Sequence, residues 1–225
     1  MDRRVTADAV RARIASLVLE SEWGKQRDAS TGGSVPQSAR IGGFTLRPVQ
    51  RRTLVDVRAA LDEFGGALLA DPPGTGKTVL ALAAAHGARR VVVFAPSTLR
   101  TQWIAAAERA EVPITFMSIE ALSRSAPRSA ADFVIIDEAH HLRTPTTRRY
   151  AHAAAACVNA LVLLLSATPL VNRASDRDAL LALFMGARAQ RLTRAELGRC
   201  VVRRHEGGGS RPALRRIGAD RKSVV

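Results

Sequence analysis

The chain has 225 residues, 47% of them apolar and 4% aromatic, which is enough to bury the core of one compact unit. Its 34 basic and 20 acidic residues leave a formal charge of +14, which suits a polyanionic partner. No apolar run is long enough to cross a bilayer, and no hydrophobic segment follows Met1-Asp-Arg-Arg4, so a membrane-spanning or secreted protein is not expected.

The first predicted element is an amphipathic helix over residues 7–20, whose apolar positions recur at helical spacing. Residues 30–43 are rich in glycine and serine and are expected to be coil. We therefore expect three parts: residues 1–43 as a helix and linker, residues 44–190 as a globular lobe, and residues 191–225 as a basic C-terminal segment.

Within residues 44–190, predicted helices and strands alternate. A helix is expected over residues 48–63, and short apolar runs predict strands over residues 66–70, 91–95, 113–118, 132–136 and 160–165. Helices are expected between the strands. This alternation predicts an α/β fold with a doubly wound, mostly parallel sheet, in which the loops of interest lie at one edge.

A glycine-rich turn, Asp71-Pro-Pro-Gly-Thr-Gly-Lys-Thr78, joins the strand over residues 66–70 to the next helix. It carries the Gly-Lys-Thr end of a phosphate-binding loop, in which backbone N–H groups and the lysine hold phosphates and the threonine ligates magnesium. Asp71 stands where the strict pattern has glycine, so the match is partial, and an ordinary glycine turn is the alternative. The residues expected to bind the nucleotide are Gly74, Thr75, Gly76, Lys77 and Thr78.

Two carboxylates, Asp137 and Glu138, follow the predicted strand over residues 132–136, at the edge of the sheet where ligands bind. Asp137 is suited to hold magnesium, directly or through water, and Glu138 is suited to polarise the water that attacks the γ-phosphate. An acidic pair is often only a solvated turn. This pair ends an apolar strand, however, and the loop lysine with its metal would supply the partner that buried acids need.

A third polar stretch, Ser166-Ala-Thr168-Pro169, ends the predicted strand over residues 160–165. Its hydroxyl groups are expected beside the same edge of the sheet, where they are placed to relay the state of the nucleotide. We do not expect Ser166 to be a catalytic nucleophile, because the sequence has no Gly-x-Ser-x-Gly elbow.

The order, spacing and flanks of these stretches resemble the first motor lobe of the superfamily-two helicases, specifically the Swi/Snf-related group of DNA translocases. The resemblance covers residues 44–205 and includes the basic strand Cys200-Val-Val-Arg-Arg204. It implies a RecA-like P-loop NTPase lobe of the DEAH type, with ATP and magnesium as cofactors. It also implies double-stranded DNA as the partner and movement along the duplex without strand separation.

The resemblance also implies roles for residues outside the phosphate loop. In Phe44-Thr-Leu-Arg-Pro-Val-Gln50, the glutamine matches the one that recognises adenine in this family, and His140 is expected to couple the nucleotide and nucleic-acid sites. The segment Val91–Trp103 resembles the strand and turn that grip the nucleic-acid backbone. The residues expected to make that contact are Pro96, Ser97 and Thr98.

Two alternatives stay open. Residues 72–78 alone are typical of AAA+ ATPases, but the upstream glutamine segment, His140 and Ser166-Ala-Thr168 favour the helicase pattern. The other is a nucleotide-gated nucleic-acid binding module without turnover. Motors of this class take arginine fingers from a second RecA-like lobe, and no such lobe fits after residue 205. Since loss of a finger costs about 10³ to 10⁵ in rate, the chain alone is expected to hydrolyse ATP very slowly, and neither Arg203 nor Arg204 is an evident substitute.

Over half of the positive excess lies in residues 186–225, which carry 11 basic and 3 acidic residues and favour nucleic acid as the partner. A string that looks like a sequencing adapter would encode residues 220–225, so we expect the native residues of a truncated chain to stop at residue 219, with a genuine basic C-terminus as the alternative. The two cysteines are expected to be free thiols in a reducing compartment. The expected location is therefore the cytoplasm, with nucleoid association if the chain is bacterial.

Overall fold

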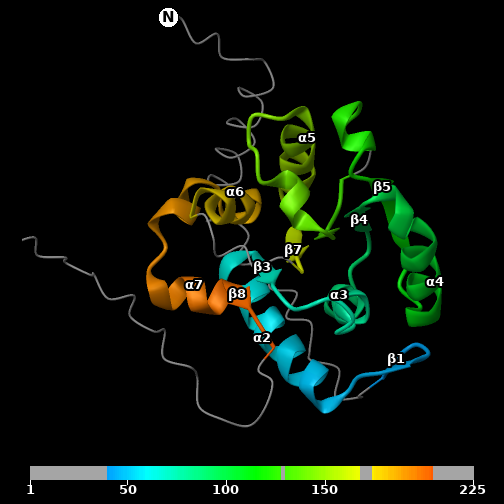
Figure 1. Cartoon of the computed structure of the whole chain (residues 1–225). Helices are drawn as coiled ribbons and strands as arrows, with labels where there is room; N and C mark the ends of the chain where they lie inside the picture. The colour runs from blue at the N-terminus through cyan, green and yellow to red at the C-terminus, as the bar shows by residue number, and fades with distance from the viewer. Residues whose placement is uncertain (1–39, 128–129, 168–173, 205–225) are drawn as a thin grey trace, which may run out of the picture.

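The computed structural model describes residues 40–127, 130–167 and 174–204. The helix expected over residues 7–20, the hydroxyl of Thr168 and the basic residues beyond Arg204 lie outside these ranges. The described residues form a six-stranded sheet with helices on both faces (Figure 1). The predicted α/β class, a doubly wound parallel sheet of the P-loop type, is confirmed.

All pairings within the six-stranded sheet are parallel, and the strand order is β5-β4-β6-β7-β3-β8. Five of these strands lie within one residue of the predicted bounds, and the sixth is the short strand expected in the Cys200–Arg204 segment. The strands are β3 (Gly66–Leu69), β4 (Val91–Ala95), β5 (Ile114–Ser118), β6 (Phe133–Ile136), β7 (Leu161–Leu165) and β8 (Val201–Val202).

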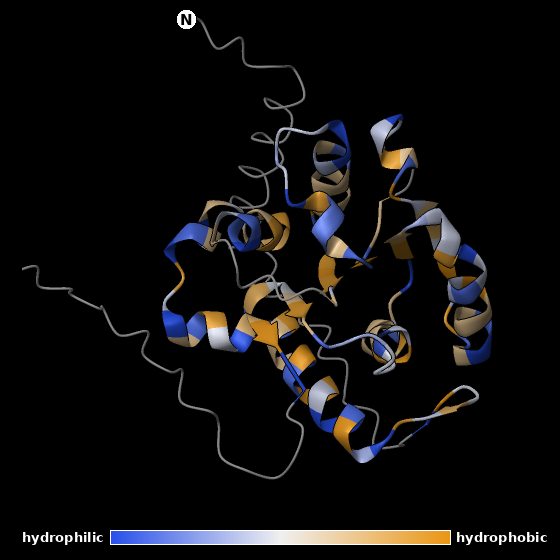
Figure 2. Cartoon of the chain, viewed as in Figure 1, coloured by the Kyte–Doolittle hydropathy of each residue, from blue (hydrophilic) through white to orange (hydrophobic). Residues whose placement is uncertain are grey.

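The inner strands are uninterrupted apolar runs because both of their faces are covered by helices. All four residues of β6 are buried, as are the last four of β7. Figure 2 shows hydrophobic strands, among them β7 and β3, near the centre of the lobe and hydrophilic residues on the surrounding helices. The sheet is therefore a rigid platform, and its functional loops extend from its carboxyl edge.

Helices cover both faces of the sheet (Figure 1). These helices are α2 (Pro48–Phe64), α3 (Lys77–Ala85), α4 (Arg100–Ala110), α5 (Arg148–Cys157) and α6 (Ala174–Met185). A further helix, α7 (Arg194–Cys200), packs against α2 and leads into β8. Short 3₁₀ turns complete the lobe: η2 (Ser97–Leu99), η3 (Ala121–Ser123), η4 (Ala139–Leu142) and η5 (Gly186–Arg191).

Residues 40–43 belong to a small hairpin. The prediction of coil over residues 30–43 was therefore wrong for these four residues. Strand β1 (Arg40–Ile41) pairs antiparallel with β2 (Phe44–Thr45) through a Gly-Gly turn. Gly42 has φ +48, and a Cβ on it would lie 2.5 Å from the carbonyl oxygen of Arg109 in α4. The N–H of Gly43 donates to that same oxygen over 2.7 Å, so the glycines allow the hairpin to contact the end of α4.

The globular unit also continues beyond residue 190, where the sequence predicted its end. Helix α7 begins with a capping box in which the Thr193 hydroxyl accepts the Glu196 N–H and the Glu196 carboxylate accepts the Thr193 N–H. Arg199 then forms an ion pair with Glu63 of α2 at 2.7 Å, and β8 follows at the edge of the sheet. Among the described residues, no helix is both long and apolar enough to cross a bilayer.

Candidate nucleotide site

The glycine-rich turn connects β3 to α3, as the sequence predicted. Gly76 is the N-cap of α3, with φ +83, and Gly74 has φ +74, so both adopt the left-handed region that favours glycine. A Cβ on Gly76 would also lie 2.6 Å from Nε2 of Gln50. The first N–H groups of a helix have no intrahelical acceptor, so this turn presents donors suited to an anion.

Lys77, the first residue of α3, folds back over the turn. Its Nζ donates to the carbonyl oxygens of Asp71, over 2.7 Å, and Pro72, over 3.1 Å. The Thr75 hydroxyl donates to the same Pro72 oxygen over 2.9 Å. Lys77 and the neighbouring Thr78 are both half-buried residues at the start of α3.

Asp137 follows β6 directly and is buried. Its Oδ2 accepts the indole N–H of Trp103 over 3.0 Å, and its Oδ1 accepts the N–H of Glu138 over 2.9 Å. Burial raises the pKa of Asp137, while these two hydrogen bonds and the positive charge of Lys77 lower it. Each carboxylate oxygen has a second lone pair, so the group keeps the capacity to ligate a cation.

The strand order explains how Lys77 and Asp137 come to the same side of the molecule. Strands β3 and β6 are both neighbours of β7, so the loops that follow them are separated by two strand spacings, or about 10 Å. The positive charge of Lys77 lowers the pKa of Asp137, which agrees with this proximity. The amine and the carboxylates therefore lie at one edge of the sheet, as expected, and their catalytic roles stay predictions.

Glu138 adopts a backbone conformation that side chains other than glycine disfavour. It has φ +48 and ψ +48 and precedes η4, a geometry that costs an ordinary residue about 1–2 kcal/mol. Its Oε2 lies 3.2 Å from Nδ1 of His140, and both side chains are about one-third exposed. The second acid of the pair is thus held toward the histidine that the resemblance assigns to coupling.

Ser166 and Gln50 both contact the phosphate loop or the strand before it. Ser166 is fully buried at the end of β7, and its N–H donates to the carbonyl oxygen of Leu69 over 3.1 Å. Gln50 is buried, its Oε1 accepts the Arg47 N–H over 2.9 Å, and its Nε2 lies 3.5 Å from the Thr75 carbonyl oxygen. Its amide therefore lies against the outside of the loop, and adenine recognition stays a prediction.

The residues assigned to the nucleic-acid backbone lie at the same edge, beyond the end of β4. Ser97 and Thr98 are exposed in η2, after the half-buried Pro96. The N–H of Ser97 points to Oε2 of Glu120 at 3.2 Å. Because β4 is adjacent to β6, this turn neighbours the acidic pair rather than the phosphate loop.

Sequence reasoning missed two partners of these residues, Trp103 and Arg204. Trp103 was not expected to contact Asp137, and Arg204 was not expected to serve the site. The backbone N–H of Arg204 donates to Oδ1 of Asp71 over 2.7 Å, and its Nη2 donates to the Thr75 carbonyl oxygen over 2.8 Å. The one signal in the sequence was Asp71 itself, an acid where the phosphate-loop pattern has glycine.

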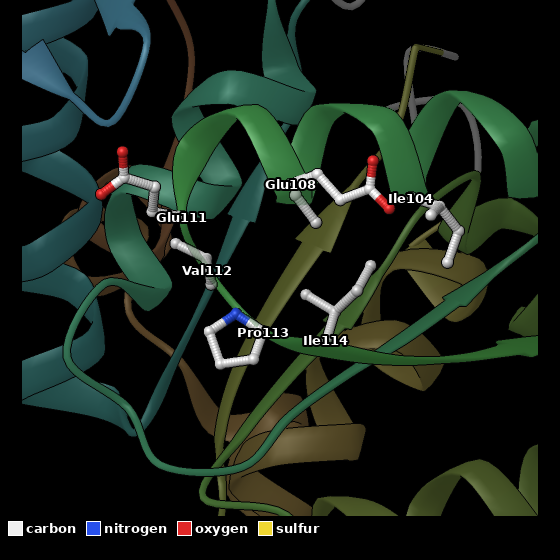
Figure 3. A pocket seen from close by; sticks show the side chains of 7 residues that line it. Ile104, Glu108, Glu111, Val112, Pro113 and Ile114 are labelled. Carbon is white, nitrogen blue, oxygen red and sulfur yellow. The ribbon is translucent and has the colours of Figure 1, made fainter.

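A shallow hollow of about 240 Å³ lies elsewhere, at the end of α4 and the start of β5 (Figure 3). Because it lies at the amino end of a parallel strand, it is on the opposite edge of the sheet from Lys77. Its walls are mainly apolar, and its charged residues, Glu108 and Glu111, are acids that disfavour an anion. We therefore assign the nucleotide to the phosphate loop and not to this hollow.

Comparison with known proteins agrees with a P-loop ATPase. Two of the solved structures that share the fold are SWI2/SNF2 ATPase cores. One is the Sulfolobus solfataricus SWI2/SNF2 ATPase core in complex with dsDNA (TM-score 0.61, 17% identity, 74% of this chain and 46% of that chain). The other is the SWI2/SNF2 ATPase core domain of the same organism (TM-score 0.58, 16% identity, 77% of this chain and 46% of that chain). The chain thus spans about half the length of each, and no curated protein matches it in sequence.

The family comparison supports a P-loop ATPase and bears on the AAA+ alternative that residues 72–78 left open. The sequence model of the ATPase family associated with various cellular activities (AAA) matches residues 67–206, although the sequence analysis placed AAA+ behind the helicase pattern. The physical reason is that the phosphate loop and the strands that carry it are shared by both classes. The match covers more than half of the chain, which therefore belongs to the ATPase family associated with various cellular activities (AAA).

Proposed function

We propose that the chain is the ATP-binding lobe of a Swi/Snf-like motor ATPase, which couples ATP hydrolysis to movement on duplex DNA. The observation that carries this proposal is the position of Lys77 and the Asp137–Glu138 pair on either side of β7 at one edge of the sheet. An amine facing two acids across such a gap suits a polyphosphate and its cation.

In this proposal the phosphates lie at the start of α3. The backbone N–H groups of the glycine-rich turn and the Lys77 ammonium hold the phosphate oxygens, once the ammonium exchanges its contacts with the Asp71 and Pro72 carbonyls. Gln50, buried beside the Thr75 carbonyl, faces the adenosine side of the loop. Glu138 orients the attacking water, and its carboxylate accepts the proton that the water gives up.

Thr78 and Asp137 would hold magnesium, which supplies positive charge to the phosphate oxygens during transfer. The residues fit such a cation because Asp137 is a buried carboxylate whose ionised form burial disfavours. Trp103 and the Glu138 N–H fix the orientation of that carboxylate. His140, next to Glu138, would transmit the state of this site to the surface that carries Ser97 and Thr98.

Duplex DNA is proposed as the partner for two reasons. A solved structure that shares the fold contains an ATPase core in complex with dsDNA. The chain carries a formal charge of +14, which would attract phosphates, and binding to them should weaken steeply as salt rises. Movement on the duplex would also need a second RecA-like lobe, which completes the site with arginine fingers.

The family match favours a second candidate, an AAA-type ATPase whose hydrolysis does not respond to DNA. One experiment separates the two: ATP hydrolysis by the natural full-length protein, measured with and without duplex DNA. The proposed motor requires a rate that rises with DNA, whereas an unchanged rate would favour the second candidate.

Two variants test the site in the same assay. Lys77→Ala should lose nucleotide binding, and Glu138→Gln should bind nucleotide but hydrolyse it at least about 100-fold more slowly, a typical loss for a general base. Circular dichroism should show that both variants keep the fold. Undiminished hydrolysis by either variant would contradict the assignment of the site.

A further inference from the structure

Asp71 carries a buried carboxylate at the start of the phosphate loop. Its side chain is 1% exposed, and its own backbone carbonyl accepts the Lys77 ammonium over 2.7 Å. A buried negative charge so close to the phosphate site opposes an anionic ligand unless a cation compensates for it. The compensating group must therefore come from another part of the chain.

Arg204, which follows β8, provides that group. Its backbone N–H donates to Oδ1 of Asp71 over 2.7 Å, and its Nε lies 3.5 Å from Oδ2, the length of an ion pair rather than of a hydrogen bond. The Arg204 side chain is only 11% exposed. The pairing of β8 with β3 sets this geometry, because the N–H of Ala70 donates to the Val202 carbonyl oxygen over 2.9 Å.

The same guanidinium also holds the outside of the loop. Nη2 of Arg204 donates to the Thr75 carbonyl oxygen over 2.8 Å, and Nη2 of Arg47 donates to that oxygen over 3.3 Å. The amide of Gln50 lies 3.5 Å from it. Donors from two elements thus converge on one carbonyl, which fixes the peptide unit between Thr75 and Gly76 just before α3.

We infer that Arg204 is a positioning residue of the nucleotide site, which neutralises the Asp71 carboxylate and anchors the Thr75 carbonyl. The loop can then present its N–H groups and Lys77 to a polyphosphate without an opposing buried charge. This inference rests on the proposed nucleotide site and adds to it a residue 129 positions away in sequence from the loop.

The test measures binding of fluorescent N-methylanthraniloyl derivatives of ATP and AMP, with magnesium, to the full chain. Arg204→Ala should weaken ATP binding by at least about tenfold and AMP binding much less, because the opposing charge acts more strongly on more phosphates. Arg203→Ala removes the same charge from the exposed neighbouring residue, and it should change neither affinity.

The double variant Asp71→Asn with Arg204→Ala separates charge compensation from simple loosening of the loop. It should recover most of the lost ATP affinity, because no unpaired carboxylate is left. Arg204→Gln, alone and with Asp71→Asn, repeats the comparison with a side chain that still donates to Thr75 and so serves if Arg204→Ala fails to fold.

The outcomes are distinct. A wild-type chain that binds neither nucleotide overturns the proposed function itself. Wild-type binding of ATP together with equal binding by Arg204→Ala overturns only the role of Arg204. A double variant as weak as the single variant, or an equal loss for ATP and AMP, overturns the neutralisation of Asp71.

Discussion

The indole N–H of Trp103 donates to Oδ2 of Asp137 over 3.0 Å, and both side chains are buried. The bond joins α4 to the end of β6, so packing on one face of the sheet fixes the orientation of a carboxylate at its edge. A carboxylate oriented in this way is ready to receive a cation without losing further rotamer freedom.

Trp103→Phe should therefore lower the free energy of unfolding by about 1–3 kcal/mol beyond the effect of lost volume, because a buried carboxylate oxygen loses its donor. Urea denaturation checks this value. In an Asp137→Ala background the same substitution should cost less, since the acceptor is already gone. If Trp103→Phe lowered the free energy of unfolding equally in the wild type and in Asp137→Ala, Trp103 would contribute packing only.

The strained backbone of Glu138 leads to a second prediction. Glu138→Gly should raise the free energy of unfolding by up to about 1 kcal/mol, because glycine adopts φ +48 without the steric cost. The same variant should lose ATP hydrolysis. Glu111→Gly is a matched control, since Glu111 has φ +58 at the exposed end of α4, and it should stabilise the fold without loss of hydrolysis. A lower free energy of unfolding for Glu138→Gly would contradict the proposal that the backbone of Glu138 is strained.

Substitution by alanine should have opposite effects on stability at Gly76 and at Gly198. Gly76→Ala should destabilise the fold by about 1–3 kcal/mol and weaken nucleotide binding, because it combines φ +83 with a contact of 2.6 Å to Gln50. Gly198→Ala, in α7 with nothing within 4 Å of the added Cβ, should stabilise the fold by about 0.5–1 kcal/mol. Thermal unfolding and nucleotide titration of both variants provide the comparison.

The cap of α7 predicts a dependence of stability on pH. Hydrogen bonds from the backbone and hydroxyl of Thr193, together with one from Arg188, lower the pKa of Glu196 from 4.5 to about 2. Since Glu196 has a lower pKa in the folded state than in the unfolded state, its contribution to the free energy of unfolding is complete above pH 4.5. That contribution is lost as pH falls toward 2. The difference in Tm between the wild type and Glu196→Gln should therefore shrink over that range. A difference independent of pH would contradict this prediction.

The strands were predictable because each inner strand is an apolar run long enough to be buried on both faces. Once the sheet was inferred to be parallel, Lys77 and Asp137 had to lie at the same edge, and they do. The hairpin at residues 40–45 was missed because a Gly-Gly pair is equally typical of a linker and of a tight turn.

The contacts of Asp137 and Asp71 were beyond sequence reasoning for a different reason. Trp103 and Arg204 are far from these acids in sequence, and no periodicity links them. Their contacts depend on how α4 packs on the sheet and on β8 pairing with β3. The sequence alone also could not separate the helicase pattern from the AAA family, because both classes share the phosphate loop and the strands that carry it.

The strand pairing around β3 has a consequence for biosynthesis. Gly66 pairs with Val162 and Leu68 with Val201, so this strand leaves the ribosome long before either of its neighbours exists. The nascent chain must keep an apolar segment unpaired until translation reaches the residues of β8, and such late, distant pairings make folding slow. The glycine-rich turn is thus among the last parts of the lobe to acquire its surroundings, although it is encoded in the first half of the chain.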